Sequence, residues 1–164
     1  MKNELLNEMN SLLDYSKETG QFIWKVAKKK GSKIGDKAGS KEKLGYVSLK
    51  VNGKYYKAHR LAWFMSYAVW PKGDIDHING IRDDNRLCNL RDVTTRVNMQ
   101  NQRKAMSMNK SGFLGVGKQD SYAKFRSRIT VNGECLYLGS YDTAEQAHQV
   151  YLKAKRKYHE GATI

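Results

Sequence analysis

The 164-residue sequence predicts an α+β fold that is organised in two units. Two Asn-Gly pairs, Asn52-Gly53 and Asn132-Gly133, each lie between runs of β-forming residues, which is the strongest short-range signal for a β-hairpin. Segments whose apolar residues recur every three or four positions predict helices around these hairpins. Residues 104–111 (KAMSMNKS) show neither pattern, so the chain is expected to divide near residue 107.

The first half of the chain is expected to alternate helices with short antiparallel strands. The expected elements are a helix over 4–13, a strand over 21–26, hairpin strands over 45–50 and 55–58, and a helix over 59–70. Pro71, the only proline of the chain, is expected to end that last helix because proline cannot continue it.

A polar segment with a strand–loop–strand–helix pattern follows, DIDHINGIRDDNRLCNLRDVTTRVNMQN over residues 74–101. The expected elements are a strand over 75–78, a polar loop, a strand over 90–93 and a helix capped by Thr94 or Thr95. Asp76 and His77 lie side by side on the first strand, and Asn98 lies near the start of the helix.

The last part of the chain is expected to form a small three-stranded antiparallel sheet packed on one helix. Its strands are expected over 112–118, 123–131 and 134–138. Thr143-Ala-Glu-Gln146 is a capping box that begins the helix. The apolar face of that helix is expected to hold Ala144, Ala147, Val150, Tyr151 and Ala154.

The charge of the chain indicates a polyanionic partner. Thirty Lys and Arg residues against sixteen Asp and Glu residues give a net charge of +14, which favours nucleic acid. The densest stretch is residues 17–57, with twelve lysines and three acidic residues; the alternative for its lysine-rich part is a solubilising face or flexible loop. No apolar run approaches the roughly 20 residues of a spanning helix, so a soluble, cytoplasmic protein is expected. Cys88 and Cys135 are expected to be unpaired thiols.

Three residues of segment 74–101 suit phosphodiester hydrolysis. The carboxylate of Asp76 and the amide oxygen of Asn98 are hard ligands that suit a divalent metal ion, magnesium first and manganese as the alternative. A neutral imidazole at His77 could take the proton from a water molecule.

The ordered set of motifs resembles the ββα-metal core of the HNH endonucleases, especially the phage homing endonucleases, over about residues 45–103. The matching motifs are Asp76-His77-Ile78-Asn79-Gly80, Asn85-Arg86, Asn89-Leu90-Arg91 and Asn98. The resemblance implies that His77 is the general base, that Asp76 and Asn98 hold one metal ion, and that Asn89 braces the loop. The upstream segment Lys57-Ala-His59-Arg60-Leu-Ala-Trp63 also resembles the corresponding part of these proteins. Candidate phosphate contacts are His59, Arg60, Arg86 and Arg91, with packing as the favoured role for His59.

Residues 112–160 resemble the ethylene-response-factor (AP-two) DNA-binding domain. The matching motifs are Gly115-Val116, the run Leu138–Ala147 and the pair Tyr151 and Ala154. The resemblance implies that one face of the sheet enters the major groove. The expected DNA-binding residues are Lys118, Lys124, Arg126, Arg128, Thr130 and Tyr137. The first strand departs from the family, and the alternative is a solvated basic sheet that only supports the nuclease.

Together these patterns predict an HNH endonuclease domain over 1–105, a linker over 106–111 and an AP-two-like domain over 112–164. The first would contain a basic β region over 17–57 and the metal core over about 74–103. The expected function is site-selective cleavage of double-stranded DNA by a homing-type nuclease, as a monomer or homodimer, in the host cell cytoplasm if phage-encoded. The alternatives are a non-enzymatic DNA-binding protein, such as a transcription regulator, and an RNA-binding or structural protein. Because every expected catalytic residue precedes Lys104, a chain ending there is expected to keep the nuclease centre.

Overall fold

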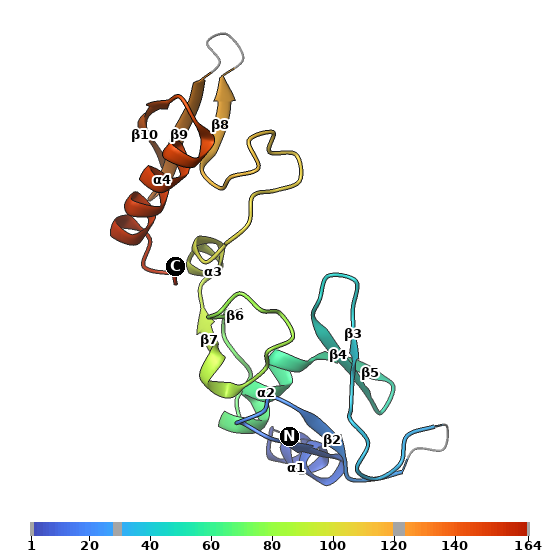
Figure 1. The fold of residues 1–164 in the computed structure, drawn as a ribbon. Helices are drawn as coiled ribbons and strands as arrows, with labels where there is room; N and C mark the ends of the chain where they lie inside the picture. The colour runs from blue at the N-terminus through green and yellow to red at the C-terminus, as the bar shows by residue number, and fades with distance from the viewer. Residues whose placement is uncertain (1, 28–30, 120–123, 164) are drawn as a thin grey trace. The chain divides into compact units, whose positions relative to one another are not determined.

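The computed structural model describes residues 2–27, 31–119 and 124–163 and confirms a mixture of helices and small antiparallel sheets (Figure 1). The contacts within the chain divide it into two compact units, Met1–Thr94 and Thr95–Ile164.

The first unit contains two helices and three small sheets within its described residues. Helix α1 (Lys2–Leu12) runs directly into β1 (Leu13–Tyr15), which pairs with β2 (Phe22–Trp24). The second sheet consists of β3 (Ser40–Lys41), β4 (Val47–Val51) and β5 (Lys54–Lys57), and it is followed by helix α2 (Ala58–Tyr67). The third consists of β6 (Asp74–His77) and β7 (Leu90–Val93), joined by a loop that ends in the 3₁₀ turn η1 (Leu87–Asn89).

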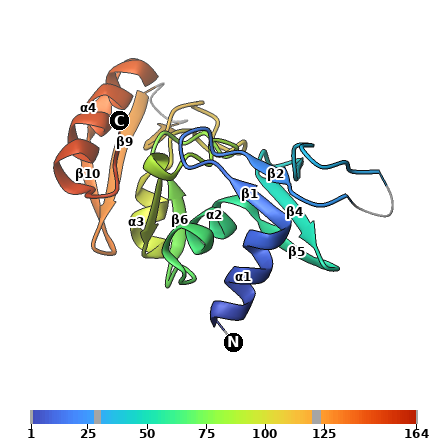
Figure 2. The ribbon, with the colours of Figure 1, turned by 90° about the horizontal axis from the view of Figure 1, so that it is seen from below.

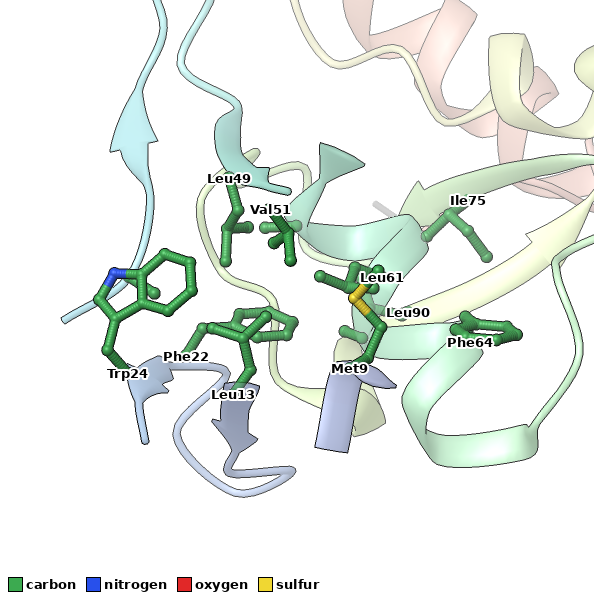
Figure 3. Packing of buried hydrophobic residues seen from close by; sticks show 13 residues of the cluster. Met9, Leu13, Phe22, Trp24, Leu49, Val51, Leu61, Phe64, Ile75 and Leu90 are labelled. Carbon is green, nitrogen blue, oxygen red and sulfur yellow. The ribbon is translucent and has the colours of Figure 1, made fainter. Parts of the chain in front are cut away.

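One apolar core joins these elements, as Figure 3 shows. Leu13 and Phe22 from the first sheet meet Leu49 from the second, and Leu61 on α2 is completely buried among them. The labelled members of the core are Met9, Leu13, Phe22, Trp24, Leu49, Val51, Leu61, Phe64, Ile75 and Leu90. Ile75 and Leu90 attach the β6–β7 hairpin to this core, so the polar residues beside them on the hairpin are fixed in place.

The second unit contains α3 (Thr95–Gln100), strands β8 (Val116–Gln119), β9 (Lys124–Val131) and β10 (Glu134–Tyr141), and helix α4 (Ala144–Tyr158). The strands form an antiparallel sheet in the order β10-β9-β8, and α4 packs along one face of it (Figure 2). Ile129 of β9 packs with Tyr151 and Ala154 of α4. Burial of this apolar face leaves the opposite face of the sheet exposed.

Predictions that depend on a few neighbouring residues, such as the hairpin turns and the helix cap, are confirmed. Asn52 and Asn132 have φ angles of 46° and 53°, and the glycines that follow them are also in the left-handed region, as tight hairpin turns require. The hydroxyl of Thr143 accepts a hydrogen bond from the backbone N–H of Gln146 at 3.2 Å, as the capping box predicts. Strand β7 occupies the predicted residues 90–93.

Several predicted bounds were wrong. Helix α2 ends at Tyr67, before Pro71, because Ala68 adopts a left-handed conformation (φ 57°) and its N–H donates to the carbonyl of Phe64. Strands β1 and β3 were not predicted, and β10 continues three residues further than expected.

The strand expected from residue 112 begins at Val116. The side chains of Asn109 and Ser111 hold the carbonyls of Phe113 and Val116, which folds the preceding residues into turns. Ala123, the expected first residue of the next strand, lies outside the described residues.

Gly20 provides a test of how the first sheet supports the β6–β7 loop. Its φ is +71°, and a Cβ there would lie 2.4 Å from the backbone nitrogen of Arg86 and 2.5 Å from the carbonyl carbon of Asn85. Gly53 has a similar φ of +82° but nothing within 4 Å of its Cβ position. Gly20→Ala should therefore destabilise the first unit by about 1–3 kcal/mol more than Gly53→Ala, since overpacking is added to the same backbone strain.

Tryptophan fluorescence during urea unfolding measures this difference, because all three tryptophans, Trp24, Trp63 and Trp70, lie in the first unit. Equal destabilisation by the two substitutions would show that the close approach of Gly20 to the loop does not exist in solution.

Candidate active site

The antiparallel pairing of β6 and β7 determines where the expected metal ligand Asp76 and the expected general base His77 lie. Asp76 is opposite Arg91, and His77 is opposite Leu90. Both side chains are buried, each with 5 % of its surface exposed. A buried carboxylate and a buried imidazole require polar partners, because leaving such groups unpaired away from water costs several kcal/mol.

Arg91 is a charged partner of Asp76. Its Nε and one terminal nitrogen donate to the same carboxylate oxygen, Oδ2, at 2.9 and 2.8 Å. A guanidinium that makes two bonds to one carboxylate fixes both its charge and its orientation. Arg91, expected as a phosphate contact, thus lies against the expected metal ligand.

Asn85 is a polar partner of His77. Its side-chain oxygen, Oδ1, lies 3.3 Å from Nε2 of the imidazole, and its amide nitrogen donates to the carbonyl of Asp83. Since an amide oxygen only accepts, Nε2 carries the proton in this contact, and Nδ1 is then the basic nitrogen of the neutral ring. Burial lowers the pKa of His77, against the opposing effects of Asn85 and Asp76, so the ring is neutral near pH 7.

Asn89 links the two sides of the loop between β6 and β7. Its Oδ1 accepts from the backbone N–H of Asn79 at 2.9 Å, and its Nδ2 donates to the carbonyl of Asp84 at 2.8 Å. Asn79 in turn donates to the carboxylate of Asp84, which also binds Arg86. These bonds give the polar loop a defined shape next to His77.

Residues of the β1–β2 hairpin support the same loop. The hydroxyl of Tyr15 donates to the carbonyl of Asn85 at 2.8 Å, and the N–H of Leu87 donates to the carbonyl of Lys17 at 3.0 Å. Burial raises the pKa of Tyr15, so its phenol stays protonated as the donor that this contact requires.

His59, at the start of α2, belongs to a cluster of rings around His77. The ring centroids of His59 and His77 are 5.2 Å apart in an edge-to-face arrangement, and Tyr46 lies 5.4 Å from His59 and 6.0 Å from His77. Burial, and then the nearby His77, lower the pKa of His59 to about 3. The ring is therefore neutral, and within the described parts of the chain its buried Nδ1 has no hydrogen-bond partner. A neutral ring packed in this way supports His77 sterically rather than attracting phosphate by charge.

The remaining candidate phosphate contacts bind protein groups. Arg60 donates to the carbonyls of Gly73 and Pro71 and so holds the connection between α2 and β6. Arg86 makes two bonds to the carboxylate of Asp84, which contributes to a pKa of about 2 at that carboxyl. A phosphate role for these arginines stays a prediction.

The expected metal ligands lie on different elements. Asp76 is on β6 in the first unit, whereas Asn98 is on α3, which groups with the second. Among residues 2–27, 31–119 and 124–163, no three His, Cys, Asp or Glu side chains gather as a metal cluster. The chemistry of the expected set nevertheless fits: a carboxylate and an amide oxygen are hard donors, and magnesium usually retains several waters and few protein ligands.

The exposed face of β9 carries a row of cations. Lys124, Arg126, Arg128 and Thr130 are exposed, while Ser127 and Ile129 between them are buried toward α4. Tyr137 on β10 is 61 % exposed and lies opposite Arg128, which places it on the same face.

Lys118 does not belong to that face by register. It pairs with Phe125, whose side chain packs with the core residues under α4, whereas Gly117 pairs with Arg126. The structure therefore brings five of the six expected DNA-binding residues to one face of the sheet and separates Lys118 from them.

Sequence reasoning assigned no role to Asn85, Tyr46 or Tyr15. Asn85 was part of the motif around His77, and its position eight residues after that histidine was the one available signal. Tyr15 reaches the loop across 70 residues and Tyr46 reaches His77 across 31, and no local pattern marks contacts of this kind.

Comparison with protein families shows that residues 56–100 match the model described as HNH endonuclease. The match extends from β5 to α3 and so supports a nuclease whose substrate is DNA. The match lies in the middle of the chain. It therefore does not extend to residue 1, where the HNH domain was expected to begin. Comparisons with curated proteins and with solved structures gave no match. No helix in the described part of the chain has the length and hydropathy needed to cross a membrane.

Asn89 gives a prediction for the loop. Asn89→Asp keeps the oxygen that accepts from Asn79 but removes the N–H that donates to Asp84, and Asn89→Ala removes both bonds. Each bond removed leaves a part-buried backbone group to be satisfied elsewhere, so we expect stability losses of about 1 kcal/mol or more, larger for the alanine variant.

Urea unfolding measures the stabilities, and hydrogen exchange at the Asn79 amide measures the local effect. Asn52→Ala is unsuitable as a control because its φ is positive, but Asn10→Ala changes the same residue type at an exposed position of α1. Unchanged exchange at Asn79 in both Asn89 variants would disprove the bracing role.

Proposed function

We propose that this protein is a metal-dependent DNA endonuclease of the HNH, homing type in which His77 is the general base. The observation that carries the proposal is that the HNH-matched segment contains a buried, neutral imidazole held by Asn85. A general base must be unprotonated and oriented before the reaction, and both conditions follow from the packing around His77.

In this mechanism Nδ1 of His77 takes the proton of the water that attacks the phosphorus atom. The hydrogen bond from Nε2 to the amide oxygen of Asn85 keeps the proton of the neutral ring on Nε2 and leaves Nδ1 basic. Packing against His59 and Tyr46 restricts rotation of the imidazole. Hydrolysis that releases the 3′ oxygen leaves a 5′-phosphate and a 3′-hydroxyl end.

Asp76 and Asn98 are the residues that would hold a divalent metal ion, magnesium or alternatively manganese. When bound, the ion would supply positive charge to the scissile phosphate and its leaving oxygen. Arg91 orients the carboxylate of Asp76, and the bonds of Asn89 shape the neighbouring loop. The pairing of Asp76 with Asn98 rests on the resemblance to HNH enzymes and on the chemistry of their oxygen donors.

The second unit is proposed to bind double-stranded DNA in the manner of ethylene-response-factor domains. The exposed cations of β9 alternate with residues buried under α4, so they present charge on one side of the sheet only. A two-stranded or three-stranded sheet fits the major groove, where arginine side chains can bind guanine edges. One HNH centre cuts one strand per event, so a monomer would nick DNA and a homodimer would cut both strands.

A plasmid nicking assay separates the enzyme from a transcription regulator with the same charged sheet. We expect conversion of supercoiled DNA in magnesium and none in EDTA, with DNA binding retained in both. Binding without conversion under either condition would favour the non-enzymatic alternative.

His77→Gln should abolish cleavage while leaving DNA affinity nearly unchanged, because glutamine cannot take the proton from water. Loss of a general base typically lowers the rate by about 10²–10⁴-fold. His148→Gln is the matched control, since His148 is a half-buried histidine of α4 whose Nδ1 lies 2.9 Å from the backbone carbonyl oxygen of Leu114. Single-turnover cleavage and a gel-shift titration provide the two measurements, and full cleavage by His77→Gln would reject this residue as the base.

The double substitution Arg126→Ala, Arg128→Ala should weaken DNA binding and reduce its dependence on salt. Removal of one cation from a phosphate lowers the slope of log K against log salt by roughly 0.9. Lys153→Ala, Lys157→Ala is the control, because it removes the same charge from exposed positions of α4. Equal effects of the two double variants would mean that the sheet contributes to DNA binding only through net charge and does not form a specific binding face.

A further inference from the structure

Helix α3, which carries Asn98, is too short to be stable by itself. It has six residues, and none of them is buried. Isolated helices below about 12–15 residues are marginal in water because the first turn is costly to form. The helix therefore depends on contacts that other parts of the second unit make with it.

We propose that the segment following α4, together with Lys155, forms a latch that holds α3 and so positions Asn98 for catalysis. This inference rests on the proposed function, because it takes Asn98 to be a metal ligand. The C-terminal segment returns to α3 in Figure 1.

The closest part of the latch is Gly161. Its N–H donates to the side-chain oxygen of Gln100 at 3.0 Å. A Cβ at this position would lie 2.2 Å from the carbonyl oxygen of Val97, so the backbone of the segment packs directly on the helix. Only glycine permits this approach without displacing either backbone.

Thr163 extends the latch to the residues that follow α3. Its hydroxyl donates to the side-chain oxygen of Asn101, which is 6 % exposed, and accepts from Arg103. Arg103 also donates to the backbone carbonyl of Thr163 at 3.2 Å. The exit of α3 is thereby tied to the C-terminal segment by side chains on both sides.

Lys155 connects α4 to the same exit. It is 1 % exposed, and its Nζ donates to the backbone carbonyl of Gln102. Burial, with Arg103 nearby, lowers its pKa to about 8. A buried ammonium group is tolerated only with such a partner, so this contact fixes the distance between the two segments.

Arg96 completes the contacts at the start of α3, with bonds to Asn132 at 3.1 Å and Glu160 at 3.3 Å. These groups are largely exposed, so they contribute little compared with the buried contacts. A chain ending near Lys104 would have none of these supports. The latch therefore predicts that such a chain loses cleavage, whereas the sequence alone predicts that it keeps the nuclease centre.

The decisive substitution is Gly161→Ala, which forces the segment away from Val97 while leaving the proposed DNA-binding face of β9 untouched. Gly112→Ala is the matched control: it lies in the same unit and has a strained φ of +73°, but nothing lies within 4 Å of its Cβ position. The first readout is hydrogen exchange at the amides of Asn101 and Gln102, which donate to the carbonyls of Asn98 and Met99.

In Gly161→Ala we expect these two amides to exchange roughly tenfold faster or more, because local opening of α3 becomes easier. We also expect a higher magnesium concentration for half-maximal cleavage and a lower kcat, with the Kd for DNA unchanged. Gly112→Ala should leave exchange and magnesium dependence as they are. If Gly161→Ala does not fold, Thr163→Val and Thr163→Ser replace it. Valine removes the hydroxyl that bonds to Asn101 and Arg103, and serine keeps it, so only Thr163→Val should show faster exchange.

Three outcomes overturn the latch: unchanged exchange at the two amides, equal changes in Gly112→Ala, or faster exchange with an unchanged magnesium dependence and kcat. Asn98→Ala, compared with Met99→Ala on the exposed side of α3, tests the proposed function separately. If Asn98→Ala leaves the magnesium dependence unchanged, Asn98 is not a metal ligand and the catalytic role of the latch fails with it. Exchange at α3 would still report whether the segment holds the helix.

Discussion

The antiparallel register of β6 and β7 is the constraint on which the candidate active site depends. Successive side chains of a strand point to opposite faces, so a slip of one residue would exchange the surroundings of Asp76 and His77. Ile75 and Leu90 are both in the apolar core, and their burial makes such a slip costly. The register in turn places Asp76 opposite Arg91. Burial of the neighbouring apolar side chains thus fixes the positions of Asp76 and His77.

Burial of polar groups around His77 explains why the loop after β6 has so many side-chain bonds. Asp76, His77, Asn85 and Asn89 are each no more than 5 % exposed, and each has a partner at hydrogen-bond distance. A buried network that is satisfied is rigid, whereas a partly satisfied one would destabilise the fold. The orientation of His77 is therefore established before any substrate arrives, as the proton transfer proposed for this residue would require.

Sequence patterns predicted those features that depend on neighbouring residues. The Asn-Gly turns and the Thr143 cap follow from backbone conformations that few residues adopt, and these are correct. The motif around His77 located the candidate site for the same reason, since its residues lie within one loop. The support of that loop by Tyr15 and the grouping of α3 with the second unit depend on long-range contacts, such as those of Tyr15 with Asn85 and of Gln100 with Gly161, which join residues 70 and 61 positions apart. No periodicity encodes such pairs, so the boundary expected near residue 107 followed composition alone.

If the DNA-binding and metal-binding roles proposed above hold, the attachment of α3 within the second unit links DNA binding to catalysis thermodynamically. A ligand that binds only the folded state stabilises it by RT ln(1 + [L]/Kd), which is about 2.7 kcal/mol at a hundredfold excess over Kd. If the exposed face of β9 binds DNA as proposed, that free energy is shared by every element that unfolds together with the sheet. Because the contacts of Gly161 and Lys155 tie α3 to α4, and α4 covers the sheet, the helix that carries Asn98 becomes more ordered when DNA is bound. Cleavage away from a bound target would then be limited by the order of α3 as well as by affinity.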